Sequence, residues 1–253
     1  MDVEVFLTSA AVEEDDVKGR TVIVIDVLRA CSTITTALNN GARAVVPVLD
    51  MAQAGKIASN LDSSMYRLGG ERGGKKIEGY HLGNSPFEYT TEEVEGRDVI
   101  LNTTNGTKAL TRARGAKHLI AGCLLNASRV IDFVREANTD VTIICAGRQD
   151  RISLEDTLCA GLLLSRLWED REPEVTSDAA HTAYTQYLHD RNDLEALLKR
   201  CNHARHLIES GFEEDVDYCL QIDTLPVLPY YEDSRLVLYD QVTASSSPSV
   251  PSV

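Results

Sequence analysis

A carboxylate, a guanidinium and two hydroxyl groups follow one short apolar run near the N-terminus. The run, residues 21–25, reads Thr-Val-Ile-Val-Ile, and Asp26, Arg29, Ser32 and Thr33 come soon after it. A continuous β-branched run predicts a central strand buried on both faces, and ligands of open α/β sheets bind at the carboxyl ends of such strands. We expect Ser32 or Thr33 to cap the next helix, whose N-terminal amides favour an anion. The stretch could therefore hold a cation and a phosphate together; the alternative is that Asp26 only caps a turn and pairs with Arg29.

A glycine-rich loop adds a second acid and further positive charge. Six of the eighteen residues in 69–86 are glycine, which permits close approach of the backbone to a ligand. Glu71 supplies a hard oxygen donor of the kind that Mg²⁺ prefers, Arg72 and two lysines supply positive charge, and Asn84 is a candidate ligand contact. Ser85 precedes a proline and begins a capping-box pattern, so we interpret it as a helix cap rather than a nucleophile. The alternative for the whole segment is a flexible surface loop.

Hydroxyl and amide side chains gather where another strand meets a helix. The strand 98–102 runs into a turn that precedes the helical segment 108–114. Free backbone amides at such a junction can bind an oxyanion, and the spacing is not that of a nucleotide-binding P-loop. We predict an anion-binding turn, the alternative being an Asn-Gly turn with a threonine cap. The turn comprises Asn102, Thr103, Thr104, Asn105, Gly106 and Thr107.

The loop after strand 141–145 offers further substrate contacts and an alternative nucleophile. Gly147 and Arg148 follow the strand directly and are candidate substrate-binding residues. Cys145 and Arg151 have the C-x5-R spacing of thiol phosphatases in a strand-loop-helix setting. Because no histidine precedes the cysteine and the loop has a single glycine, we disfavour a cysteine nucleophile.

Two later helices carry acids and histidines. Glu155 and Asp156 fall in the first turn of a long helix, where the dipole favours acids, and one of them could still face the site. The segment 176–210 is helical in pattern and contains three potential metal ligands, Cys201, His203 and His206. Arginines adjoin both histidines, so we interpret this surface as a solvated helix face rather than a metal site.

Strands alternate with helical segments along most of the chain, which predicts βαβ crossovers. The expected fold class is α/β, a three-layer α/β/α sandwich with a mostly parallel or mixed sheet. We expect one domain over residues 1–240, which could comprise two sub-lobes, and a disordered low-complexity tail over 241–253. The strand-to-helix junctions near Asp26, Asn102 and Cys145 can then share one sheet edge with the glycine-rich loop.

Composition and charge restrict the class of protein. The 253 residues carry a formal net charge of −14, with seven lysines and eighteen arginines, which disfavours nucleic acid as a partner. No apolar run approaches the roughly 18 residues of a membrane span, and the N-terminus lacks the basic start of a signal peptide. Six scattered cysteines indicate reduced thiols. We therefore expect a soluble cytoplasmic protein without membrane contact; a homo-oligomer would be unsurprising.

Carboxylates, arginines and amide-rich turns at one sheet edge are the groups that magnesium-assisted phosphoryl transfer needs. No nucleotide fingerprint accompanies them, so a phosphohydrolase acting on a small anionic phosphorylated substrate is favoured over a kinase. A non-catalytic anion-binding protein is the competing interpretation. Such a protein would gain nothing from placing Asp26 and Glu71 beside basic residues.

Several motifs in this order resemble the 2-phosphosulfolactate phosphatase family. They are Asp-Val-Leu-Arg-Ala-Cys-Ser-Thr at 26–33, Gly-Glu-Arg at 70–72, Gly-Asn-Ser-Pro at 83–86, Thr-Asn-Gly-Thr at 104–107, and Cys-Ala-Gly with Ser-Leu-Glu-Asp within 145–156. The resemblance covers about residues 3–240. It implies a three-layer α/β/α fold and Mg²⁺-dependent hydrolysis of (R)-2-phospho-3-sulfolactate to sulfolactate and phosphate, a step in coenzyme M biosynthesis.

From their chemistry we expect the following roles within such a site. Asp26 is a magnesium ligand or the nucleophile, and the ligand role is favoured because position 28 is leucine, not the second aspartate of Asp-x-Asp phosphatases. Glu71 is the second ligand and Asp156 the third. Arg29 and Arg72 contact phosphate or the carboxylate and sulfonate of the substrate. The oxyanion turn and remaining substrate contacts are Ser32, Thr33, Asn84, Asn102, Thr104, Asn105, Gly106, Thr107, Gly147 and Arg148. Another phosphorylated 2-hydroxy acid is an alternative substrate, because sulfonate and carboxylate are recognised by the same groups.

The acidic, lysine-poor composition is what we expect of a protein that works at high salt, and this hypothesis generates a prediction. Repulsion among surplus acids destabilises the folded chain, and salt screens it, with a Debye length of about 3 Å at 1 M. We expect the unfolding temperature to rise when salt is raised from the millimolar to the molar range, as measured by circular dichroism. A flat or falling melting temperature would contradict adaptation to high salt.

Overall fold

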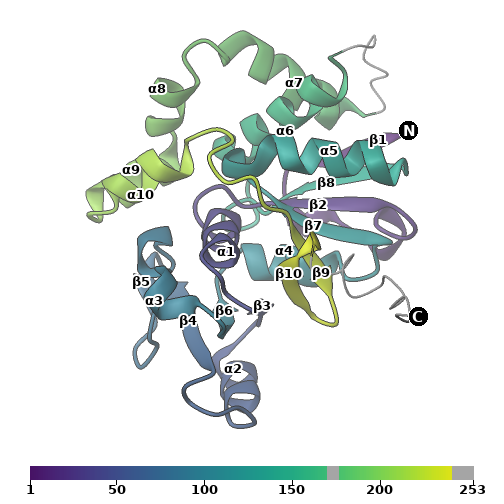
Figure 1. Cartoon of the computed structure of the whole chain (residues 1–253). Helices are drawn as coiled ribbons and strands as arrows, with labels where there is room; N and C mark the ends of the chain where they lie inside the picture. Colours follow the sequence, from purple (N-terminus) through teal and green to yellow (C-terminus); the bar gives the residue numbers. More distant parts are fainter. Residues whose placement is uncertain (170–176, 241–253) are drawn as a thin grey trace, which may run out of the picture.

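Ten strands of the described residues pair into one mixed sheet (Figure 1). The structure is a computed structural model and describes residues 1–169 and 177–240, so the predicted tail 241–253 lies outside the described residues. The strands are β1 (Val3–Phe6), β2 (Thr21–Ile25), β3 (Ala44–Pro47), β4 (Tyr66–Arg72), β5 (Lys75–Lys76), β6 (Asp98–Asn102), β7 (His118–Gly122), β8 (Val141–Cys145), β9 (Pro229–Glu232) and β10 (Arg235–Leu238). Their order across the sheet is β1-β8-β2-β7-β9-β10-β3-β6-β4-β5. The prediction of an α/β fold with a mixed sheet is confirmed.

Helices connect most of these strands. They are α1 (Ala30–Asn39), α2 (Met51–Ala58), α3 (Thr91–Val94), α4 (Gly106–Arg112), α5 (Ala127–Ala137), α6 (Leu154–Leu167), α7 (Asp178–Asp190), α8 (Leu194–Lys199), α9 (Asn202–Glu209) and α10 (Glu213–Cys219). The helical pattern predicted over 176–210 is three separate helices, α7, α8 and α9, and Ser177 caps the first of them. None of the helices in the described part combines the length and apolar character needed to cross a bilayer.

Two groups of parallel strands make up the sheet. Pairing is parallel within β1-β8-β2-β7 and within β3-β6-β4. The antiparallel hairpin β9–β10 joins the two groups through a single residue pair on each side, Ile120 with Tyr230 and Leu236 with Val45. The chain thus has one continuous sheet made of two parallel units.

Alternate side chains of β2 enter different layers of the core. Ile23 and Ile25 pack in one buried cluster with α5 and α6, whereas Val22 and Val24 pack in a second cluster with α1 and α4. All five residues of β2 are buried, as its unbroken apolar run predicts. The first strand group is therefore covered by helices on both faces, in three layers.

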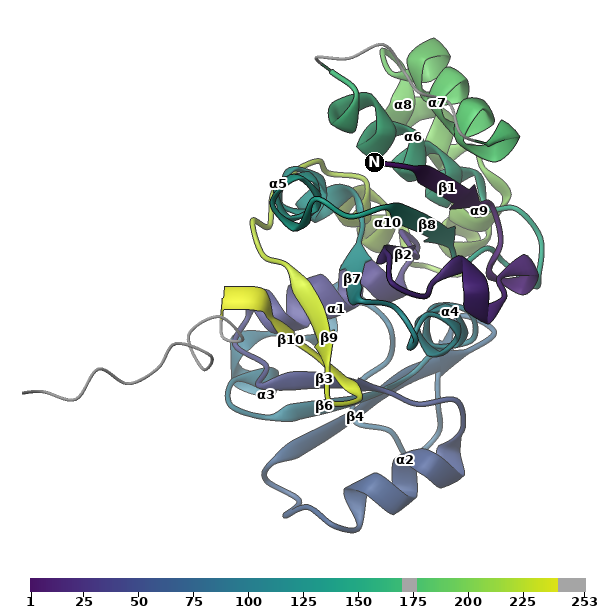
Figure 2. The same ribbon diagram turned by 90° about the vertical axis from the view of Figure 1, so that its right-hand side faces the viewer.

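The second strand group packs on the same two helices from the other side. Val99 and Leu101 of β6 belong to the cluster with α1 and α4, and Ile100 points the other way, into the cluster with α2. Helices α1 and α4 consequently lie between the two strand groups, as Figure 2 shows. This arrangement brings the loops at the ends of β2 and β6 to the same region of the molecule.

Close contact between α6 and α7 depends on one glycine. A Cβ atom placed on Gly161 would lie 2.2 Å from the carbonyl oxygen of Ala183 and 2.5 Å from Cβ of Tyr187. Gly55 of α2 offers a comparison, because it is also helical but exposed, with no atom within 4 Å of such a Cβ.

Replacing these two glycines by alanine should have opposite effects on stability. Gly161→Ala forces α6 and α7 apart and is expected to lower the free energy of unfolding by about 1–3 kcal/mol. Gly55→Ala gains helix propensity without a clash and should raise it by about 0.4–1 kcal/mol. Urea unfolding of both variants measures the difference, and equal effects at the two positions would contradict the packing described here.

Candidate active site

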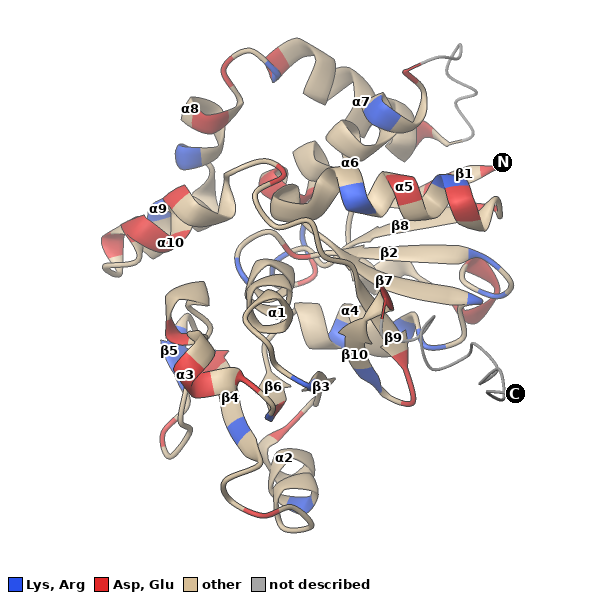
Figure 3. Cartoon of the chain, in the orientation of Figure 1, with Lys and Arg blue, Asp and Glu red and all other residues tan. Residues whose placement is uncertain are grey.

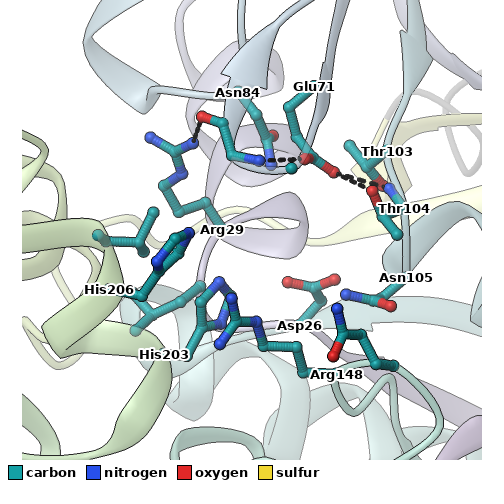
Figure 4. A pocket seen from close by; sticks show the side chains of 15 residues that line it. Asp26, Arg29, Glu71, Asn84, Thr103, Thr104, Asn105, Arg148, His203 and His206 are labelled. Atoms are coloured by element: carbon teal, nitrogen blue, oxygen red, sulfur yellow. Dashed lines mark hydrogen bonds between the residues drawn. The ribbon is translucent and has the colours of Figure 1, made fainter. Parts of the chain in front are cut away.

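The loops that follow β2, β6 and β8, together with the end of β4, surround one cavity of about 170 Å³ (Figure 4). Helix α9 contributes a further wall. The lining residues are Asp26, Leu28, Arg29, Glu71, Gly73, Gly74, Asn84, Thr103, Thr104, Asn105, Arg148, Gln149, His203, His206 and Leu207. Two carboxylates, two arginines and two histidines thus face one small space.

Asp26 lies at the end of β2 and is 6 % exposed. One carboxylate oxygen, Oδ1, accepts a hydrogen bond from the backbone N–H of Ala30 at 3.0 Å, so Asp26 caps α1 and also lines the cavity. Burial raises the pKa of Asp26 to about 6, and the charges of Glu71 and Glu155 add to this rise, while the Ala30 bond and the charge of His203 oppose it. The predicted cap residues Ser32 and Thr33 are wrong in that role. Both lie inside α1 and donate instead to the carbonyls of Val27 and Asn84.

Glycine at position 106 allows α4 to begin beside Asp26. A Cβ atom there would lie 2.6 Å from Cβ of Ala30 and 2.9 Å from Oδ2 of Asp26. The predicted ligand-contact residue Gly106 therefore acts through close packing and does not itself line the cavity. Thr107 is likewise outside the lining, since its hydroxyl donates to the carbonyl of Thr103.

Glu71 holds two loops of the cavity wall together. Its Oε1 accepts hydrogen bonds from the backbone N–H and the hydroxyl of Thr104, at 2.8 and 2.7 Å, and its Oε2 accepts from the N–H of Gly74 at 2.8 Å. The side chain is 8 % exposed. A carboxylate offers about four lone-pair sites, so Glu71 retains capacity for one more partner in the cavity.

Asn84 carries an unsatisfied acceptor. Its side-chain oxygen Oδ1 is buried and has no hydrogen-bond partner in the part of the chain that the structure describes. The residue also lines the cavity. Leaving a buried polar atom unpaired costs about 1–3 kcal/mol, and such an atom in a cavity indicates a place for a ligand.

Arg29 is a buried member of the wall. Its guanidinium forms an ion pair with Asp215 of α10, donates to the carbonyl of Gly74 at 3.1 Å, and lies 4.3 Å from the ring centre of Phe212. The predicted alternative pairing with Asp26 is wrong, because the charge of Arg29 is committed to Asp215. Ser85 also donates to Asp215, at 2.7 Å, and its hydroxyl makes no cap bond with the short turn of helix that it precedes.

The histidines of α9 correct one prediction. His203 and His206 face the cavity and do not form a solvated helix face. The 203/206 spacing places both on one side of the helix, beside the buried residues Ala204 and Leu207. This stripe of buried apolar residues is the sequence pattern that indicates a packed helix face at both histidines. The neighbouring arginines had favoured a solvated face instead.

His203 is paired with a buried carboxylate behind the cavity wall. Its Nδ1 lies 3.0 Å from Oε1 of Glu155, a residue of α6 that is 1 % exposed. Burial tends to raise the pKa of Glu155, but the hydrogen bond and charge of His203 outweigh it, so that this pKa lies below its usual value. The Sγ–H of Cys201 donates to the other oxygen of Glu155 at 3.2 Å.

Several predicted site residues have structural contacts outside the cavity lining. Asp156 accepts the backbone N–H groups of Val27 and Gly147, at 2.9 and 3.1 Å, and burial beside Asp26 and Glu155 raises its pKa well above the usual value. The prediction that Asp156 is a third metal ligand facing the site is therefore not supported by its position. Arg72 is exposed and donates to Oδ1 of Asn102 at 2.7 Å, whereas Nδ2 of Asn102 is buried without a hydrogen-bond partner in the described part of the chain. Neither residue lines the cavity.

The alternative nucleophile is also outside the cavity lining. Cys145 is fully buried at the end of β8, and burial raises the pKa of its thiol well above the usual value. Its loop partner Arg148 does line the cavity, and its guanidinium has no hydrogen bond or ion pair within residues 1–169 and 177–240. Arg148 is thus a cation available to an anionic ligand.

Charge in the cavity differs from charge over the rest of the molecule. Acidic side chains gather on outer helices such as α3 and α10, where Glu92, Glu213 and Glu214 are exposed (Figure 3). In the cavity, two acids face two arginines and two histidines. A locally mixed charge of this kind suits a bound cation together with an anion.

Comparison with known proteins agrees with the resemblance seen in the motifs. The family model of 2-phosphosulpholactate phosphatase matches residues 6–234. The chain is 40 % identical over 231 residues to a probable 2-phosphosulfolactate phosphatase of Caldanaerobacter subterraneus, covering 90 % of this chain and 95 % of that protein. Proteins with the same description from Symbiobacterium thermophilum and Clostridium acetobutylicum are 40 % and 37 % identical, covering 89 % and 94 % of this chain and 97 % and 100 % of theirs. The matched region contains every strand and loop of the cavity, and the chain belongs to the 2-phosphosulpholactate phosphatase family.

Proposed function

We propose that this chain hydrolyses (R)-2-phospho-3-sulfolactate to sulfolactate and phosphate in a Mg²⁺-dependent reaction, the type of step found in coenzyme M biosynthesis. One observation carries the proposal: the carboxylates of Asp26 and Glu71 face the same small cavity as Arg148 and His206. An anion-binding site alone would be weakened by two acids. A site for a cation and a polyanion together is strengthened by them.

The oxygen donors of the cavity fit a magnesium ion. Asp26, Glu71 and the unpaired Oδ1 of Asn84 are hard oxygen ligands. No group of three acidic, histidine or cysteine side chains suited to a metal occurs among the described residues. Mg²⁺ does not require one, because it is commonly bound by one or two carboxylates, substrate phosphate and water. When bound, the ion would offset negative charge on the phosphoryl oxygens.

The remaining cavity residues have roles in binding and orientation. Arg148 and His206 can bind the acidic groups of the substrate, and the bidentate guanidinium suits carboxylate, sulfonate and phosphate. Thr104 is fixed by Glu71, which holds the turn 103–105 against the ligand space. Arg29, with its charge paired to Asp215, shapes the wall and contributes a more weakly available positive charge.

Another phosphorylated 2-hydroxy acid is the second candidate substrate. A cavity of about 170 Å³ suits a small three-carbon phosphate ester, and Arg148 can bind a carboxylate as well as a sulfonate. The chemistry is the same for both, so only turnover distinguishes them.

Phosphate release should depend on metal and on substrate. With Mg²⁺, we expect the protein to release phosphate from racemic phosphosulfolactate faster than from phospholactate or phosphoglycolate. Phosphate release should stop when a chelator removes the metal ion. Release only from the other esters would support the phosphatase reaction but contradict phosphosulfolactate as its substrate. No release from any ester, by folded protein over a salt series, would favour the anion-binding alternative.

Asp26→Asn tests the central carboxylate, because asparagine keeps the size and the acceptor for Ala30. We expect loss of turnover and loss of the rise in melting temperature that Mg²⁺ gives to the wild type. Full turnover and metal dependence in the variant would contradict the ligand role.

The same variant should be more stable than the wild type in chelator at high pH. The pKa of Asp26 is raised from 3.8 to about 6, so its contribution to stability is present below pH 3.8 and is lost as the pH rises through 6. At pH 8 the variant avoids a cost of up to about 3 kcal/mol, whereas at pH 3.5 the two proteins should be equal. Urea unfolding at both pH values measures this, and a variant less stable at pH 8 would contradict it.

A further inference from the structure

A carboxylate and an imidazole form a pair that the roles given above do not use. Glu155 of α6 and His203 of α9 meet at 3.0 Å, from elements far apart in the sequence. Glu155 is 1 % exposed, while the side chain of His203 retains 19 % exposure. A buried carboxylate therefore supports a partly open imidazole.

The imidazole faces the cavity on the side away from Glu155. His203 lines the cavity and Glu155 does not, and Glu155 is bonded to Nδ1. His203 and Asp26 line the same cavity, so the ring shares the ligand space with the carboxylate at the centre of the site (Figure 4). Since Nδ1 is committed to Glu155, Nε2 is the nitrogen available to a ligand.

Both oxygens of Glu155 have partners. Oε1 faces His203, and Oε2 accepts from the thiol of Cys201, which burial keeps protonated by raising its pKa to about 12. Because Glu155 keeps a lowered pKa despite its burial, it remains a carboxylate that can pair with a positively charged imidazolium. The other charged groups that line the same cavity are Asp26, Arg29, Glu71 and Arg148.

We propose that His203 is a catalytic residue, the general acid that donates its Nε2 proton to the leaving oxygen of the phosphate ester, and that Glu155 is the positioning residue that orients it. This role rests on the proposed phosphatase function. It assigns to the cavity a proton donor distinct from Arg148, which is proposed to bind the substrate, and from the two carboxylates, which are proposed to bind the metal ion.

The step is balanced as an ordinary ester hydrolysis. The oxygen of water forms a new bond to phosphorus. The bond between phosphorus and the ester oxygen breaks, and its electron pair remains on the ester oxygen. His203 gives its proton to the oxygen, so that the product is a neutral alcohol. The proton lost by the attacking water passes through the product phosphate to solvent, and His203 regains a proton from solvent.

The test compares two leaving groups in one protein. The alkyl ester phosphosulfolactate needs a proton on its leaving alkoxide, whereas p-nitrophenyl phosphate leaves as a stable phenolate that needs none. We expect His203→Gln to lower kcat for the alkyl ester by about 10²–10⁴-fold and to leave the aryl ester almost unchanged. Retained aryl turnover also shows that the variant is folded.

Glu155→Gln and His206→Gln separate positioning from binding. Glu155→Gln should also lower the ratio of alkyl to aryl turnover, but by a smaller factor than His203→Gln, because the imidazole is still present. His206 lies one helical turn away on the same wall and has no carboxylate partner among the described residues, so His206→Gln should raise KM for both esters and leave the ratio unchanged.

Three outcomes would overturn the proposal. Equal losses on both esters in His203→Gln would make the residue a general base or a structural tie between α6 and α9. No loss on either ester in His203→Gln would exclude proton donation by this residue. A wild type that is inactive on every ester would overturn the proposed function and this role together. If the wild type hydrolyses phospholactate but not phosphosulfolactate, phospholactate takes its place as the alkyl ester in the comparison.

Discussion

A buried negative charge at the end of β2 is the constraint on which the site depends. Asp26 follows a strand with no exposed residue, and a single hydrogen bond from Ala30 offsets only part of the cost of burying it. The rest of the neighbourhood is shaped to tolerate this charge. Gly106 leaves room for Oδ2, and His203, which lines the same cavity, tends to lower the pKa of the carboxylate. A bound cation would relieve the same cost directly, which couples ligand binding to the stability of the fold.

Other acids of the site act mainly as ties between loops. Glu71 joins the glycine-rich loop to the turn at Thr104, Asp156 joins the loops after β2 and β8, and Asp215 joins Arg29 to Ser85. Each carboxylate accepts from groups on two segments, so the cavity wall is cross-linked without disulfides. This use of acids explains why a carboxylate at a strand end or helix start need not face the substrate.

The fold was predictable from the sequence to a greater extent than the site. The unbroken run of β2 and the alternation of strands and helices sufficed for an α/β sheet with ligand-binding loops at the ends of β2, β6 and β8, and these loops do meet. Side-chain roles were harder, because they depend on partners distant in sequence. Ser32 has the residue type of a cap but lies inside α1, and Asp26 accepts from the first N–H of that helix instead. Arg72 is a free cation in the sequence, but in the fold it donates to Asn102. The role of His203 depends on Glu155, which lies next to it only because α9 packs against α6.

The C-terminal helices complete the cavity through charge as well as apolar packing. Leu207 and Ala204 of α9 belong to the same buried cluster as α6, which supplies the driving force for docking. Two polar contacts then fix the orientation, the ion pair of Arg29 with Asp215 and the contact of His203 with the carboxylate of Glu155. Each joins a residue of the strand-end region to one of these helices. Because a buried charge without its partner is strongly destabilising, helices α9 and α10 cannot leave the wall without exposing or stranding these charges. Docking of the C-terminal helices therefore completes the site, because it places His203 and His206 in the wall of the cavity.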